Sequence, residues 1–134
     1  MKDKELLLKD LCGRLPYGVV IKHVLRSDLE TSDLFSIDTD KQVVYCRTKG
    51  REERYGVEFV MPYLRSMSSM TEEERETYRN LQHDVWCNEY SPTYYESIAS
   101  LDWLNKNMFD YRGLIPRGLA IEAPSGMYKE KESV

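Results

Sequence analysis

A zinc site is the first chemistry that residue types and spacing suggest. His83 and Cys87 are four residues apart in a segment with helical periodicity, so both would lie on one face of the helix. Cys12, Cys46 or His23 would have to complete the site, but the sequence holds no CxxC or HxxxH pair to supply the other half. The favoured interpretation is therefore ordinary helix-face residues, with no metal or cofactor.

Nucleophilic catalysis by a cysteine has equally little support. A cysteine nucleophile needs a base within hydrogen-bond reach, and neither His23 nor His83 has the glycine-rich or elbow-like context of known sites. Cys12 is predicted at a helix end and Cys46 in mid-strand, where small buried side chains are common. We predict no catalytic residues. An odd number of cysteines, far apart in the sequence, indicates free thiols in a reducing compartment.

The aromatic residues give a stronger indication of function. The chain has ten tyrosines and two tryptophans, and these residue types are enriched at protein interfaces. The predicted partner surface consists of Tyr90, Tyr94, Tyr95, Trp103 and Tyr111. The alternative is that most of these side chains support the core and loops. Residues 110–113 (DYRG) are likewise either a recognition loop or a turn braced by an Asp–Arg pair.

Nucleic-acid binding is the disfavoured second hypothesis. Its candidate residues combine charge with stacking: Lys22, Arg47, Lys49, Arg51 and Arg54, with Tyr17, Tyr45 or Tyr55 as the stacking residue. The net charge of −4 gives no general attraction to phosphates, and Glu52 and Glu53 interrupt the basic cluster. That cluster is interpreted as a solvated turn.

Length and hydropathy bound the architecture. A chain of 134 residues fits one domain with one core, and no apolar run is long enough to span a membrane. The charged N-terminus MKDKELLLKDL does not have the pattern of a signal peptide. We therefore expect a cytoplasmic, single-domain protein over residues 1–134.

A helix and several strands are predicted in the first half of the chain, and they must position these residues. Residues 3–15 carry a leucine stripe typical of an amphipathic helix. Residues 17–61 predict a small antiparallel sheet of about four to five strands, with Tyr55–Met61 as the clearest strand and a charged turn before it. Element order resembles Sm-like and SH3-like barrels, so closure into a barrel is the alternative to an open sheet.

The joint Pro62–Leu81 separates this sheet from a helical part, residues 71–128. Pro62 is expected to end strand pairing, and Thr71 and Glu74 have the spacing of a capping box. Two helices follow, to about Cys87 and over Tyr95–Met108, and a short strand is predicted near residues 119–121. The fold class is therefore α+β, with both C-terminal helices packed on the sheet.

Three passages resemble a known group of proteins. They are KELLLKDLCGRLPYGV, PYLRSMSSMTEEE and SLDWLNKNMFDYRGLIPRGLAIEAPSGMY, which together span both ends and the joint. They are similar to small proteins of gut anaerobic bacteria and their phages and prophages, a family with no established activity. The resemblance implies an intracellular accessory protein of mobile-element origin, with no catalytic residues to transfer.

These observations lead to one main expectation about function. The chain is predicted to be a non-enzymatic protein-binding or adaptor module with an unidentified protein partner. A nucleic-acid-binding small barrel is the alternative, and an enzyme of unknown class is the weakest one. The sequence leaves the oligomeric state open.

Overall fold

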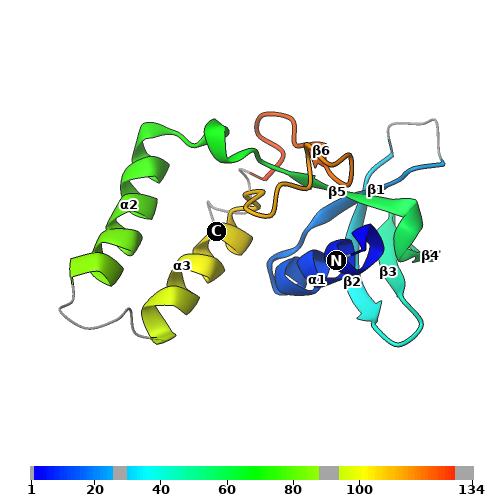
Figure 1. Ribbon diagram of the computed structural model, residues 1–134. Coiled ribbons are helices and arrows are strands. Elements are labelled where there is room, and N and C mark those ends of the chain that lie inside the picture. Colours follow the sequence, from blue (N-terminus) through cyan, green and yellow to red (C-terminus); the bar gives the residue numbers. More distant parts are fainter. Residues whose placement is uncertain (1, 26–29, 88–93, 129–134) are drawn as a thin grey trace.

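The fold is an open β-sheet with one helix on its face and two helices beside it (Figure 1). This computed structural model describes the main chain of residues 2–25, 30–87 and 94–128, and the side chains of these residues outside 82–87 and 94–97. The α+β class and the order of helix, sheet and helices agree with the sequence prediction.

Helix α1 (Asp3–Arg14) forms where the leucine stripe predicts it. Leu7 and Leu11 are buried on the side of the helix that packs on the sheet, which explains why a helix with charged residues at most other positions is stable here. A short 3-10 helix, η1 (Leu15–Tyr17), follows and ends at Gly18, whose φ of 79° needs a glycine-like conformation. The chain can then enter the first strand directly.

The sheet has six strands in the order β4-β3-β2-β1-β5-β6. Their bounds are β1 (Val20–His23), β2 (Ser32–Asp38), β3 (Val43–Thr48), β4 (Arg51–Gly56), β5 (Val60–Leu64) and β6 (Ile121–Glu122). All neighbours are antiparallel except β5 and β6, which are parallel. The two edge strands do not pair with each other in the described chain, so the barrel alternative is wrong and the sheet is mixed and open.

Strand β4 corrects the expected charged turn. The turn is only Lys49–Gly50, with φ angles of 51° and 82°, which is the backbone of a tight hairpin. The charged residues after it continue as a strand paired with β3, with Arg51 opposite Thr48. A charged strand is stable at this position because it lies at the sheet edge, where solvent reaches its side chains and charge disfavours further pairing.

Pro62 also differs from its predicted role, since it lies inside β5 opposite Ile21. The carbonyl of Leu64 accepts a hydrogen bond from Ala123 N, so alternate residues of β5 direct their main-chain groups towards β6. Pro62 precedes Tyr63, the first β5 residue paired with β6, so its missing N–H removes no ladder bond. The expected strand over 55–61 is instead interrupted by a 3-10 helix, η2 (Val57–Phe59).

The main core lies between α1 and one face of the sheet. In β3 the buried residues Val44, Cys46 and Thr48 alternate with the more exposed Val43, Tyr45 and Arg47, so the strand presents one face to the core. Leu7 and Leu11 of α1 belong to the same buried cluster as Val44 and Cys46. The same cluster also includes Met108, Leu114, Ala120 and Tyr128, so this core takes residues from both halves of the chain.

The two C-terminal helices form a pair of their own. Helix α2 (Glu72–Cys87) packs against α3 (Tyr94–Lys106), and α3 contacts α1. Figure 1 shows both helices beside the sheet instead of across its face. A second cluster of Met70, Leu104 and Phe109 joins them to the end of β5. No helix among the described residues has the length and apolar composition needed to cross a membrane.

Candidate functional site

The described members of the predicted aromatic surface make internal contacts. Trp103 is half-buried and stacks on Tyr78 at a ring-centroid distance of 5.8 Å and on Phe109 at 5.5 Å. This stack belongs to the second core cluster and joins α2, α3 and the turn after α3. Tyr90 and the side chains of Tyr94 and Tyr95 lie outside the described residues.

Tyr111 is anchored inside a buried polar cluster. Its hydroxyl donates a hydrogen bond to Asn105 Oδ1 at 2.8 Å, and the guanidinium carbons of Arg14 and Arg112 each lie 5.1 Å from its ring centre. Asp110 accepts hydrogen bonds from the main-chain N–H groups of residues 114 and 115. The DYRG segment therefore contains a braced turn, although Arg112 pairs with Asp10 and not with Asp110.

The candidate zinc and cysteine residues are dispersed where they are described. Cys46 is fully buried in the main core and Cys12 is exposed on α1, where partial burial raises the pKa of its thiol. The ring of His23 lies against Tyr55, with centroids 4.2 Å apart. Within the described ranges no cluster of three potential metal ligands occurs, and the side chains of His83 and Cys87 lie outside them.

The basic residues of the nucleic-acid hypothesis divide between several places. Lys49 and Arg51 both pair with Glu30 at the β3–β4 turn. Arg47 lies over the ring of Phe35 at 4.1 Å, and Tyr45 is cross-strand from Arg54 on the face opposite α1. Arg47 and Arg54 therefore lie with the rings of Phe35 and Tyr45 on the sheet face that α1 does not cover.

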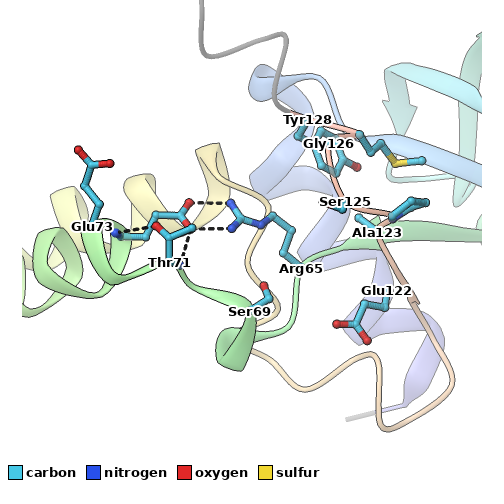
Figure 2. Close-up of a pocket in the computed structure, with 12 residues that line it drawn as sticks. Arg65, Ser69, Thr71, Glu73, Glu122, Ala123, Ser125, Gly126 and Tyr128 are labelled. Carbon is cyan, nitrogen blue, oxygen red and sulfur yellow. Dashed lines mark hydrogen bonds and ion pairs between the residues drawn. The ribbon is translucent and has the colours of Figure 1, made fainter.

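The candidate site is a cleft beside the joint, which we call the joint cleft. It has a volume of about 590 Å³ and lies between the start of α2 and the segment after β6. Five lining residues come from the joint and seven from residues 122–128; they are Arg65, Ser69, Thr71, Glu73, Glu74, Glu122, Ala123, Pro124, Ser125, Gly126, Met127 and Tyr128. Figure 2 shows Thr71 and Glu73 on one side of Arg65 and Ser125, Gly126 and Tyr128 on the other.

Arg65 holds the centre of the joint cleft. Its guanidinium donates two hydrogen bonds to the Glu74 carboxylate, at 2.7 and 2.6 Å, and stacks on Phe109 with 4.3 Å between the guanidinium carbon and the ring centre. Its main-chain N–H donates to Met108 and its carbonyl accepts from Asp110. One residue therefore connects β5, α2 and the turn that follows α3.

The Thr71–Glu74 capping box is confirmed, and it shares Glu74 with Arg65. Glu74 N donates to Thr71 Oγ1 at 3.1 Å, and Thr71 N donates to Glu74 Oε1 at 3.0 Å. The bidentate bond from Arg65, aided by these capping contacts, lowers the pKa of Glu74. The Glu74 carboxylate is therefore ionised at neutral pH and structurally engaged.

Tyr128 fixes the opposite wall. Its hydroxyl accepts a hydrogen bond from Val20 N at 3.1 Å and donates one to the Tyr63 carbonyl at 2.7 Å. The β1–β5 register places Val20 opposite Tyr63, so this hydroxyl bridges the position where the next direct ladder bond would form. Burial raises the pKa of Tyr128, which keeps the phenol neutral and able to donate.

The charge left over in the joint cleft is negative. Arg65 is neutralised by Glu74, whereas neither Glu73 nor Glu122 forms an ion pair within the described part of the chain. Glu122 accepts a hydrogen bond from Ser66 Oγ, and Ser69 Oγ donates to the Ser66 carbonyl. The lining therefore supplies hydrogen-bond acceptors and carboxylates for a cationic group.

Sequence reasoning located the joint but missed the residues that build the cleft. Arg65 has no local pattern that reveals a partner nine residues ahead in the chain, and Tyr128 is 108 residues from Val20. The Asp10–Arg14 spacing on α1 was a usable signal, since i, i+4 pairs meet on a helix, but it did not show that the pair would be buried.

Comparison with known proteins adds no assignment: no protein-family model, curated protein or solved structure matches this chain.

Proposed function

We propose that this protein is a non-enzymatic protein-binding module that holds a basic segment of its partner in the joint cleft. The single observation that supports the proposal is the cleft itself, an open space of about 590 Å³ between two rigidly attached walls. Ligand sites commonly have volumes of roughly 300–1,000 Å³. Eight of the twelve residues that line the joint cleft have polar or charged side chains, so a peptide with charged side chains suits it better than a purely apolar small molecule.

Charge determines which partner is favoured. Glu73 and Glu122 lie in the cleft without a cationic partner among the described residues, and the whole chain has a net charge of −4. A partner segment with lysine or arginine would form charge-assisted hydrogen bonds with these carboxylates. The same charge would speed association with a basic partner and disfavour an acidic one.

The rigidity of both walls supports binding without a large ordering cost. Arg65 clamps the start of α2 to β5, and Tyr128 clamps the C-terminal segment to β1 and β5. A preformed site loses less conformational entropy when it binds than a site that must first become ordered. These contacts hold the residues of both cleft walls in position.

The test uses a displayed library of random peptides selected on the immobilised protein. Enriched peptides should contain lysine or arginine, and the variant Glu73→Gln with Glu122→Gln should bind them several-fold more weakly. The matched control is Glu5→Gln with Glu76→Gln, which removes the same charge from exposed positions outside the cleft. Equal binding to both variants, or no enrichment, would contradict the proposal.

Nucleic-acid binding remains a second candidate because of one observation. Arg47 stacked over Phe35 and Arg54 across from Tyr45 form an aromatic strip with two arginines on the uncovered sheet face, where Glu52 pairs with Arg47 at 3.8 Å. Fluorescence anisotropy with a single-stranded oligonucleotide tests it, with Tyr45→Ala as the variant. Binding that weakens steeply with salt and is lost in Tyr45→Ala would favour this function over the peptide module.

Cytoplasmic location and a phage or prophage accessory role are parts of the proposal that follow from the sequence resemblance. The enzyme alternative gains no support from the hydroxyl groups of Ser69 and Thr71 or from the Glu74 carboxylate, because each of them is used in a structural hydrogen bond. Gene neighbourhood would test the mobile-element origin.

A further inference from the structure

An exposed apolar patch lies at the end of the sheet away from the joint cleft. Val24, Leu25 and Phe59 are 40%, 72% and 39% exposed, and they are three of the four large hydrophobic residues that stand out in this way among the described residues. A hydrogen bond from Val24 N to the Phe59 carbonyl, 2.8 Å long, places them together. We call these three residues the end patch.

A groove of about 300 Å³ opens directly beside the end patch. Its apolar walls come from α1, β5, the residue that follows β1 and the segment before β6, and consist of Leu7, Val24, Val60, Met61 and Leu119. Leu25, the most exposed of the large hydrophobics, is the next residue after the groove-lining Val24. One surface therefore presents both a projecting apolar side chain and an apolar groove of a size to receive one.

Both signs of charge lie on the rim of this groove. Lys4 pairs with Glu58 at 3.4 Å and Asp3 pairs with Arg117 at 3.5 Å, and all four side chains remain well exposed. Main-chain hydrogen bonding and, to a smaller extent, the Lys4 ammonium lower the pKa of Glu58, so the rim keeps both charges at neutral pH. A rim with both signs allows opposite charges to meet when a second copy of the chain is turned by 180°.

We propose that the end patch is the interface of a two-fold symmetric homodimer of this chain. In such an interface a contact from residue i to residue j is repeated from j to i. Leu25 of each copy would enter the groove of the other, and Lys4 of each would face Glu58 of the other. The end patch supplies the knob, and the groove beside it with its charged rim supplies the pocket and both charges, as a self-complementary surface must. The proposal is independent of the joint cleft, which uses other residues.

Sedimentation velocity across a concentration series tests the interface. A patch of this size is at the small end of protein interfaces, so a monomer–dimer equilibrium is expected, with the average mass rising from 15.8 kDa towards twice that value. Leu25→Glu should remain monomeric. Leu101→Glu is the matched control, because Leu101 is an exposed leucine of α3, 41% exposed, and should not affect association.

Charge reversal gives a second test that a folding defect cannot imitate. Lys4→Glu and Glu58→Lys should each weaken self-association, because each places like charges across both copies of the contact. Mixing the two variants should restore a heterodimer, since each variant then meets the opposite charge. Circular dichroism of both variants checks that the fold is unchanged.

Two results would overturn homodimer formation through this surface, and a third would overturn its two-fold arrangement. One is a wild-type protein that stays monomeric at every concentration, or that binds a different protein through Leu25 while remaining monomeric. The other is a dimer that Leu25→Glu leaves intact. A dimer lost in Leu25→Glu but unaffected in the charge-reversal variants and their mixture would also contradict the two-fold arrangement.

Discussion

Replacing Arg14 with methionine tests the polar cluster that fixes α1 to the turn after α3. Arg14 is fully buried and donates to Asp10 at 2.8 and 3.1 Å and to the Phe109 carbonyl at 2.7 Å. Methionine keeps much of the apolar volume and removes the charge and all three hydrogen bonds. Asp10 is then left with Arg112 alone, at 3.2 Å.

The expected loss of stability follows from the burial of this ion pair. Removing one partner of a buried ion pair costs about 3–5 kcal/mol. Because Arg112 still pairs with Asp10, we expect the lower part of that range, about 3–4 kcal/mol in the free energy of unfolding. At an m-value of about 2 kcal/mol per molar urea, the midpoint of urea unfolding should fall by about 1.5–2 M.

The assay is urea unfolding followed by circular dichroism. Arg75→Met is the matched control, because the pair between Arg75 and Glu72 is exposed and should leave the midpoint unchanged. Adding Asp10→Leu to Arg14→Met should restore part of the lost stability, since both buried charges are then gone. A midpoint shift below about 0.5 M for Arg14→Met alone would refute this reasoning.

Three further predictions concern single groups. Tyr128→Phe leaves two buried main-chain groups without their hydroxyl bridge, so the free energy of unfolding should fall by about 1–3 kcal/mol in the same urea assay. The folded-state pKa of Glu74 is lowered, so its contribution to stability is present above the ordinary glutamate pKa. This contribution is lost as the pH falls through the folded-state pKa. The decrease in melting temperature over that pH range should therefore be smaller in Glu74→Gln than in the wild-type protein. Under native conditions an alkylating reagent should modify exposed Cys12 well before buried Cys46, as peptide mass spectrometry would show, and equal rates would contradict the burial of Cys46.

Local sequence patterns determined the helices of this protein. The leucine stripe of α1 and the capping box at Thr71 and Glu74 act between residues three or four apart, so they were visible without the tertiary structure. The alternation of apolar and polar residues between turn sequences likewise predicted strands in the first half of the chain. The α+β class follows from these short-range signals.

Only the tertiary structure decided how the sheet ends. The charged residues of β4 look like a turn because strand propensity alone does not distinguish a solvated loop from an edge strand. Pro62 looks like a strand terminator, yet it is accommodated because β6 begins opposite the next residue. Both outcomes depend on which strands are neighbours, and that is settled by contacts between distant segments.

The joint cleft was likewise decided by contacts between distant segments. The sequence predicted that the joint Pro62–Leu81 would be important, but the joint cleft exists because Arg65 reaches Glu74 and because Tyr128 bridges β1 and β5. Such contacts form only once burial brings the groups together and makes an unpaired polar group costly. Helical periodicity was therefore readable from the chain, whereas the cleft and its charges were decided by packing.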